Sequence, residues 1–233
     1  MPFALGASFL TRIQPTSLRT QHRDSVWTLL AKFLQKSSTH DHETSLETFH
    51  AIVATVNALV RLRRDLVVHS LPHLTHILRR LISCFGIPRA QLGGKQTKQV
   101  TDNHPLWIAA PQHPLGVQEA RALARLLTML TTKTIPILGA HGSKAGRAES
   151  LAKPFAKHVM HVLKAYVDIM NDPLCAVPLE MRRELQPGLF SLCDILDRHD
   201  RDAMMVSMLD AGGKLTMKAL WQEYEKQRYV GKG

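Results

Sequence analysis

The sequence has few cysteines and no long apolar run. Its three cysteines, Cys84, Cys175 and Cys193, are odd in number and widely spaced, which favours small buried residues in a reducing compartment over a disulfide framework. Because no Cys-x-x-Cys pair occurs, a zinc site built on thiolates is not expected. No apolar stretch approaches the roughly 18 residues that a membrane-spanning helix needs, so we expect no membrane partner.

The sequence also lacks the motifs of catalytic sites. It contains no Ser/His/Asp order, no paired carboxylates and no Gly-x-Ser-x-Gly elbow. Residues 139–147 are rich in glycine, but Lys144 follows a serine where a phosphate-binding loop requires glycine. Three histidines lie within residues 69–76, yet Pro72 interrupts their helical spacing and no acid or thiol joins them. The sequence therefore predicts no enzymatic activity, no cofactor and no metal site.

The formal net charge of +11 is concentrated in the middle of the chain. Residues 51–165 carry 16 basic against four acidic side chains, whereas the flanking segments are nearly balanced. Such a concentration costs self-repulsion unless an anionic partner compensates it, so it favours binding to nucleic acid or to an acidic surface. A solvated basic face without a partner is the alternative. Aromatic residues are only 6% of the chain, which favours backbone and shape recognition of folded RNA over base stacking.

Apolar residues recur at helical spacing over most of the chain. This periodicity predicts an all-α protein of about eight helices, packed as antiparallel hairpins in an irregular bundle or short solenoid. Residues 25–35 form the first expected helix, and a capping box at Thr44 to Glu47 begins a second that runs towards Val67. Pro72 begins the next helix.

Breakers predict two turns near the C-terminus. Pro187 and Gly188 indicate a turn, because proline removes an amide donor and glycine has excess backbone freedom to lose. Gly212 and Gly213 indicate the left-handed cap that ends one helix before the last helix begins.

Composition divides the chain into an N-terminal extension with the first helix, residues 1–40, and a helical domain, residues 41–233. The first 23 residues contain no acid and three arginines, which is typical of a transit peptide. The alternative is that this stretch is the edge of a helical domain whose upstream part is missing.

Two long loops are expected inside the helical domain. Residues 87–115 contain a Gly-Gly pair and several prolines, and burial of Trp107 would tether this basic loop to the core. Residues 133–149 predict a second loop, rich in glycine and basic residues.

Basic side chains of the middle segment are candidates for binding RNA phosphates, since guanidinium groups pair with phosphates bidentately. Arginines cluster at the end of one expected helix and again on the next, so antiparallel packing would line five guanidiniums along one surface. The candidates are Arg61, Arg63, Arg64, Arg79, Arg80, Lys95, Lys98, Lys144, Arg147, Lys153 and Lys157.

Several motifs occur in a characteristic order along the second half of the chain. They are Leu185-Gln-Pro-Gly-Leu-Phe190 with the following Leu-Cys-Asp-Ile-Leu196, then Leu209-Asp-Ala-Gly-Gly-Lys214 with Leu-Trp-Gln-Glu-Tyr224, and upstream Ser150 to His158 with Tyr166. In this order they resemble the C-terminal domain of the nucleolar pre-ribosomal-associated proteins, also called unhealthy ribosome biogenesis (Urb/Npa) proteins. The likeness covers roughly residues 45 to 233 and departs from the family pattern at Lys214, where arginine is expected.

The resemblance implies a non-catalytic scaffold factor of ribosome biogenesis, which assembles early large-subunit precursors and supports pre-rRNA processing. It implies a location in the nucleus and nucleolus, with pre-rRNA and other large-subunit assembly factors, including a helicase-containing complex, as partners. Trp221, Tyr224 and Tyr229 of the C-terminal helices are candidates for protein contacts. A protein-only helical adaptor and a mitochondrial RNA-associated protein are the two alternatives.

Overall fold

The computed structural model describes residues 23–35, 45–105, 107–108, 115–133 and 150–230. These residues form ten helices and one pair of very short strands, which confirms the predicted all-α class. The helices are α2 (Arg23–Phe33), α3 (Ser45–Leu62), α4 (Arg64–Val68), α5 (Leu71–Ser83), α6 (Gly94–Thr101), α7 (Val117–Met129), α8 (Ala152–Asn171), α9 (Leu179–Ile195), α10 (Arg198–Ser207) and α11 (Ala211–Val230).

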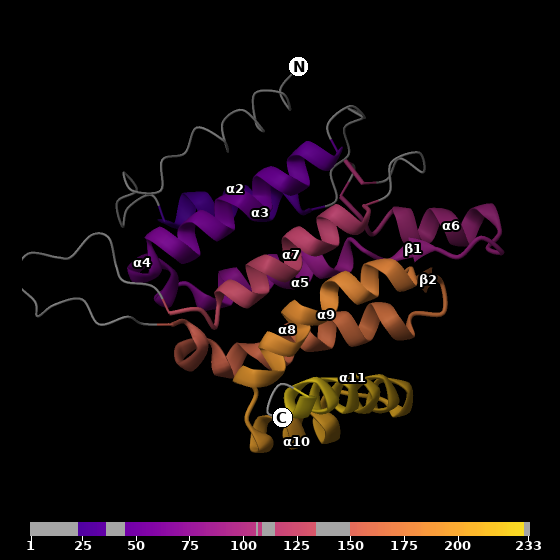
Figure 1. Cartoon of the computed structure of the whole chain (residues 1–233). Coiled ribbons are helices and arrows are strands. Elements are labelled where there is room, and N and C mark those ends of the chain that lie inside the picture. Colours follow the sequence, from indigo (N-terminus) through magenta and orange to yellow (C-terminus); the bar gives the residue numbers. More distant parts are fainter. Residues whose placement is uncertain (1–22, 36–44, 106, 109–114, 134–149, 231–233) are drawn as a thin grey trace, which may run out of the picture.

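The helices lie in successive layers. Figure 1 shows α2 and α3 followed by α5 and α7, then α8 and α9, and finally α10 and α11. Across the layers α3 packs on α7, α5 on α8, and α10 and α11 on α8, and the most extensive contact joins α7 to α9. One continuous apolar core runs through these contacts, from Trp27 on α2 to Tyr224 on α11.

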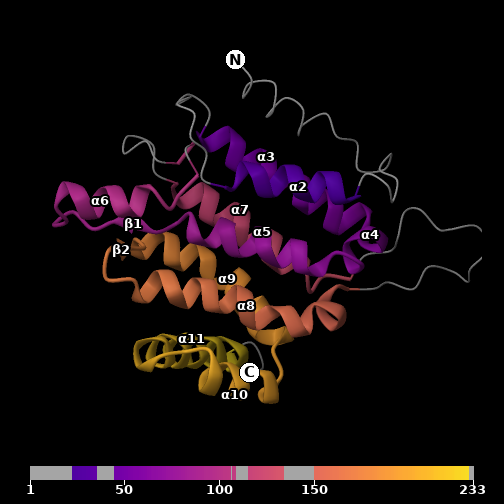
Figure 2. The same cartoon turned by 180° about the vertical axis from the view of Figure 1, so that it is seen from behind.

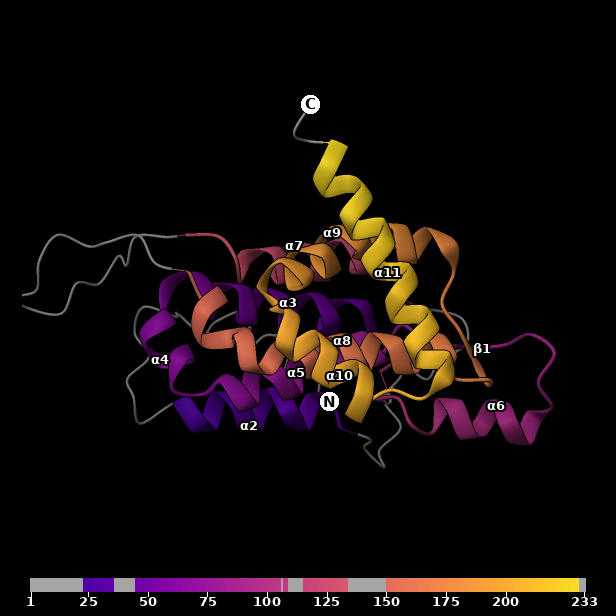
Figure 3. The same cartoon turned by 90° about the horizontal axis from the view of Figure 1, so that it is seen from below.

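A short strand pair fixes the direction of the two central helices. Strand β1 (Ile87–Pro88) follows α5, strand β2 (Cys175–Ala176) follows α8, and the two pair antiparallel. The C-terminal ends of α5 and α8 therefore meet at one end of the molecule, as Figure 2 also shows from behind. We call this the α6 end, because α6 lies there, and the opposite end the α4 end (Figure 3).

Trp107 anchors the segment between α6 and α7. Its side chain is buried, its ring lies 6.3 Å from that of Phe49, and its indole N–H donates to the carbonyl of Phe33 at 2.6 Å. The predicted tether is therefore confirmed. The segment 87–115 is not one continuous loop, however, because residues 94–101 form α6 and residues 87–88 form β1.

Helix α9 runs without interruption through Pro187 and Gly188, so the predicted turn is wrong. Gly188 is buried where α9 crosses α7, and a Cβ atom on it would lie 2.7 Å from the Cα of Ala124. The glycine is needed for a close approach of two helix backbones. Packing against α7 also offsets the cost of a proline inside the helix.

The Gly-Gly pair near the C-terminus lies in the first turn of α11, so the prediction that it caps the preceding helix is also wrong. Helix α10 has already ended at Ser207. The carboxylate of Asp210 accepts a hydrogen bond from the amide of Gly213 at 2.7 Å, which satisfies one of the free amides at the start of α11.

The second expected helix is divided in two. Helix α3 ends at Leu62 and the short helix α4 follows, with Arg63 between them, whereas one helix towards Val67 was predicted. Helices α2 and α5 agree with the sequence, and Pro72 occupies the first turn of α5 as expected. Thr44 of the predicted capping box lies outside the described residues.

Candidate nucleic-acid interface

The predicted phosphate-binding arginines lie at two ends of the molecule. Phe49 near the start of α3 contacts Phe85 just after α5, with ring centroids 5.7 Å apart, so the two helices run in opposite directions. Arg61 at the end of α3 therefore lies at the α4 end, whereas Arg79 in the last turns of α5 lies at the α6 end (Figure 3). Arg79 lies eight residues after Leu71, the first residue of α5, which is a rise of about 12 Å along the helix. The prediction that five guanidiniums line one surface is wrong.

Two of these arginines bind backbone carbonyls inside the protein. Arg64 donates to the carbonyls of Val60 at 2.9 Å and Thr132 at 2.7 Å, so it links α4 to the C-terminal end of α7. Arg80 donates twice to the carbonyl of Leu34, at 2.8 and 3.1 Å, just after α2. Both satisfy carbonyls that helix ends leave without partners. The sequence contains no signal for the bonds to Thr132 and Leu34, because these acceptors are main-chain atoms far away along the chain.

The α4 end carries a group of exposed cations. We define this group, the α4-end cations, as Arg61, Lys133, Lys153 and Lys157. Lys153 and Lys157 lie one turn apart in the first half of α8, and Arg63 nearby is paired with Asp65 at 3.0 Å. Lys144 and Arg147 lie outside the described residues, in the segment that joins α7 to α8.

The α6 end has a mixed charge. Lys95 and Lys98 are exposed on α6, and Arg79 is exposed on α5. A cavity of about 410 Å³ lies next to them and includes the carboxylates of Asp168 and Asp172 in its wall. Asp168 is paired with Lys164 at 2.7 Å, whereas the Asp172 carboxylate accepts from the Leu174 amide at 2.8 Å. Because Asp172 still adds negative charge that repels phosphate, the α4 end is the better candidate for binding an RNA backbone.

Two histidines on the same helices, His76 and His158, have lowered pKa values. Partial burial lowers the pKa of His76, and the nearby Arg80, Arg79 and His73 lower it further. On α8, burial lowers the pKa of His158 and His161 adds to this effect. Both rings are therefore neutral near pH 7. The part of the chain that the structure describes brings together no group of three or more residues suited to hold a metal ion.

The three aromatic candidates for protein contacts differ in exposure. Tyr224 is buried, and its hydroxyl donates to Asp194 at 2.5 Å. Burial raises the pKa of Tyr224 to about 12, and the bond to Asp194 contributes. Tyr224 is therefore part of the core, whereas Trp221 is half-buried and Tyr229 is exposed.

The acidic residues Asp197 and Asp202, which precede α11, both have local partners. The carboxylate of Asp197 caps the start of α10 by accepting from the amide of Asp200 at 2.7 Å. Arg201 pairs with Asp202 at 3.0 Å on the exposed side of α10. These carboxylates are thus occupied in a solvated helix edge.

Comparison with known proteins connects the chain to one family. The sequence profile of the Urb2/Npa2 family matches residues 7–232, which is nearly the whole chain and begins well before residue 45, where the resemblance was expected to start. No curated protein and no solved structure matches the chain. None of the helices in the described residues is both long and apolar enough to cross a membrane.

Proposed function

Because the chain belongs to the Urb2/Npa2 family, whose members are non-catalytic ribosome biogenesis factors, we propose that it is a scaffold that binds precursor rRNA and protein factors. It would act in early precursors of the large ribosomal subunit and support processing of their rRNA. The family match over residues 7–232 is the observation that carries this proposal. The other large-subunit assembly factors, including a helicase-containing complex, are its proposed protein partners.

The α4-end cations support direct contact with RNA. Lysine ammonium groups and a guanidinium can pair with phosphates without reading bases. Among the large exposed apolar side chains of the described residues, Tyr229 is the one that is aromatic. It lies on α11, in a different layer from the α4-end cations, so it is not placed to stack on a base there. We therefore propose recognition of the RNA backbone and shape, and not stacking on unpaired bases.

A salt titration with structured rRNA fragments tests this proposal. Each phosphate contact contributes to the slope of log affinity against log salt, so the double variant Lys153→Ala, Lys157→Ala should reduce this slope by about 2. The matched control is Lys218→Ala, Lys226→Ala, which removes two exposed cations from α11. Arg64 is not a suitable target, because its substitution would remove the hydrogen bond that links α4 to the segment after α7.

The titration separates the proposal from a protein-only adaptor. Equal losses in the two double variants would mean that net charge, and not the α4 end, attracts the RNA. Weak binding with a flat salt dependence would refute direct RNA contact and favour the adaptor. For the location we propose the nucleolus, and imaging of the tagged protein in mitochondria would contradict it.

A further inference from the structure

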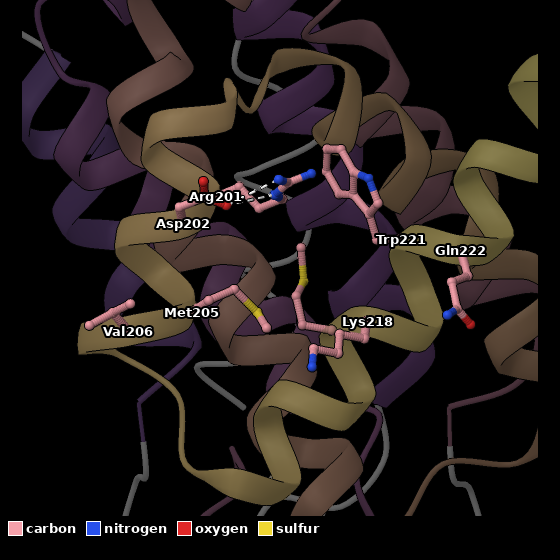
Figure 4. A pocket seen from close by; sticks show the side chains of 8 residues that line it. Arg201, Asp202, Met205, Val206, Lys218, Trp221 and Gln222 are labelled. Atoms are coloured by element: carbon pink, nitrogen blue, oxygen red, sulfur yellow. Dashed lines mark hydrogen bonds and ion pairs between the residues drawn. The ribbon is translucent and has the colours of Figure 1, made fainter.

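Helices α10 and α11 form an open groove on the last layer of the molecule. Its volume is about 420 Å³, and Figure 4 shows side chains from both helices around it. We call it the α10–α11 groove, and it is lined by Arg201, Asp202, Met205, Val206, Met217, Lys218, Trp221 and Gln222.

The walls of the groove are apolar and open to solvent. Val206 is 81% exposed, and Leu215, one turn before Lys218 on α11, is 69% exposed. Single exposed apolar residues are common on protein surfaces, but these adjoin a concave site that also contains two methionines and a tryptophan. Methionine side chains adapt to the shape of a bound partner. The site therefore suits an apolar surface of a partner.

The charged residues that line the groove, Arg201, Asp202 and Lys218, carry one net positive charge, and the Trp221 indole donates to the Glu225 carboxylate at 2.8 Å. Asp202 is paired with Arg201 at 3.0 Å and lies 3.9 Å from Arg198, so its charge is compensated. The Arg201 guanidinium also lies over the Trp221 ring, 4.9 Å from its centroid. Lys218 is exposed, and the residues three and four positions away on α11 are Lys214, Leu215, Trp221 and Gln222, none of them acidic. Lys218 thus leaves a positive charge beside an apolar surface.

We propose that the α10–α11 groove binds an amphipathic helix of a partner protein, with the apolar face on Met205, Val206 and Trp221 and a carboxylate beside Lys218. The 10 residues of α10 span about 15 Å, which accommodates two to three turns of a bound helix. A second copy of the chain fits less well, because the charged lining residues sum to +1 and a twofold contact would bring two surfaces of the same net charge together. RNA fits less well because the groove is apolar.

This inference rests on the proposed scaffold role, since it requires a protein partner. It does not depend on RNA binding, because the α10–α11 groove and the α4-end cations lie on different layers of the fold. A peptide titration without RNA and the salt titration without peptide can therefore fail separately.

The inference is tested by measuring how tightly two synthetic peptides bind to the full chain. Each peptide has about 14 residues and places leucines at i, i+3, i+4 and i+7, and one carries glutamate where the other carries lysine on the polar face. Fluorescence anisotropy of the labelled peptide measures binding. We expect the glutamate peptide to bind more tightly, and Lys218→Glu to reverse this preference.

Two further variants test the apolar surface. Val206→Glu should weaken the glutamate peptide about tenfold, because it places a charge in the groove. Leu179→Glu is the matched control, since Leu179 is an apolar residue of α9 that is 52% exposed and does not line the groove, and it should leave binding unchanged.

Several outcomes overturn the inference. Equal affinity for the two peptides would show that Lys218 does not bind the carboxylate. Equal losses of peptide affinity from Val206→Glu and Leu179→Glu would show that the peptide does not bind in the groove. Sedimentation of the chain alone gives the third test. A dimer that Val206→Glu dissociates, and that excludes the peptide, would assign the groove to a second copy.

Discussion

Substituting Gly188 with alanine should destabilise the protein, although alanine is the better helix former. In the middle of an exposed helix, this substitution stabilises by roughly 0.5–1 kcal/mol. At position 188 the added Cβ would lie 2.7 Å from the Cα and 2.8 Å from the carbonyl oxygen of Ala124. Both are main-chain atoms of α7, so no side chain can rotate away and the two helices must separate.

The expected loss can be estimated from the two opposing terms. Inserting a methyl group into a well-packed interior typically costs about 1–3 kcal/mol, and a clash with main-chain atoms belongs at the upper end of this range. Subtracting the gain in helix propensity leaves a net destabilisation of about 2 kcal/mol. For a chain of this size that corresponds to a decrease in Tm of about 4–8 °C.

Urea unfolding followed by circular dichroism measures this loss, with Gly94→Ala as the matched control. Gly94 is also helical, at the start of α6, but no atom lies within 4 Å of where its Cβ would be. Gly94→Ala should therefore be neutral or stabilising. If Gly188→Ala were as stable as Gly94→Ala, the close approach of α7 and α9 would not be the reason for a glycine at this position.

Two further substitutions probe buried polar contacts. Burial acts to raise the pKa of Glu119, but hydrogen bonds from the Gly116 amide at 2.8 Å and from His50 at 2.8 Å outweigh it and hold the pKa below the ordinary 4.5. A carboxyl whose pKa is lowered by folding contributes stability that is present above its unfolded value and is lost as the pH falls through the folded value. The stability of Glu119→Gln should therefore fall less steeply than that of the wild type below pH 4.5, and parallel acid unfolding curves would contradict this. Trp107→Phe removes the indole bond to the Phe33 carbonyl and should cost about 1–2 kcal/mol in urea unfolding. Trp221→Phe should cost less, because the bond that its indole donates, to Glu225 at 2.8 Å, is exposed to solvent. Equal costs in the two tryptophan variants would show that this bond does not anchor the segment after α6.

The distribution of cations has a consequence for how a helical scaffold holds RNA. Charge that looks like one cluster along the chain is divided by the fold between the α4 end and the α6 end, which lie at opposite ends of α5. The Asp172 carboxylate beside the α6 end reduces the attraction of this end for phosphate. Net charge of the middle segment therefore overstates the charge available to one RNA surface.

The helices and the family could be predicted from the sequence, because both depend on which residues follow one another along the chain. Helix formation places residues three and four apart on one face, so local sequence patterns located α2 and α5 to within a few residues. The order of motifs around Leu185 and Trp221 pointed to the family that the profile match over residues 7–232 shows. Charge composition pointed to an anionic partner but not to a surface.

Only the tertiary structure decided what individual breakers and cations do. Gly188 reads as a turn locally, and becomes a contact point only because α7 crosses α9 there. Arg64 and Arg80 read as surface charge, yet each reaches carbonyls at the end of another helix, and Tyr224 is buried by the packing of α11. The partner atoms in these cases lie tens of residues away along the chain. The packing of the helices, and not the local sequence, brings these atoms close together. Apolar periodicity and composition therefore cannot predict these contacts.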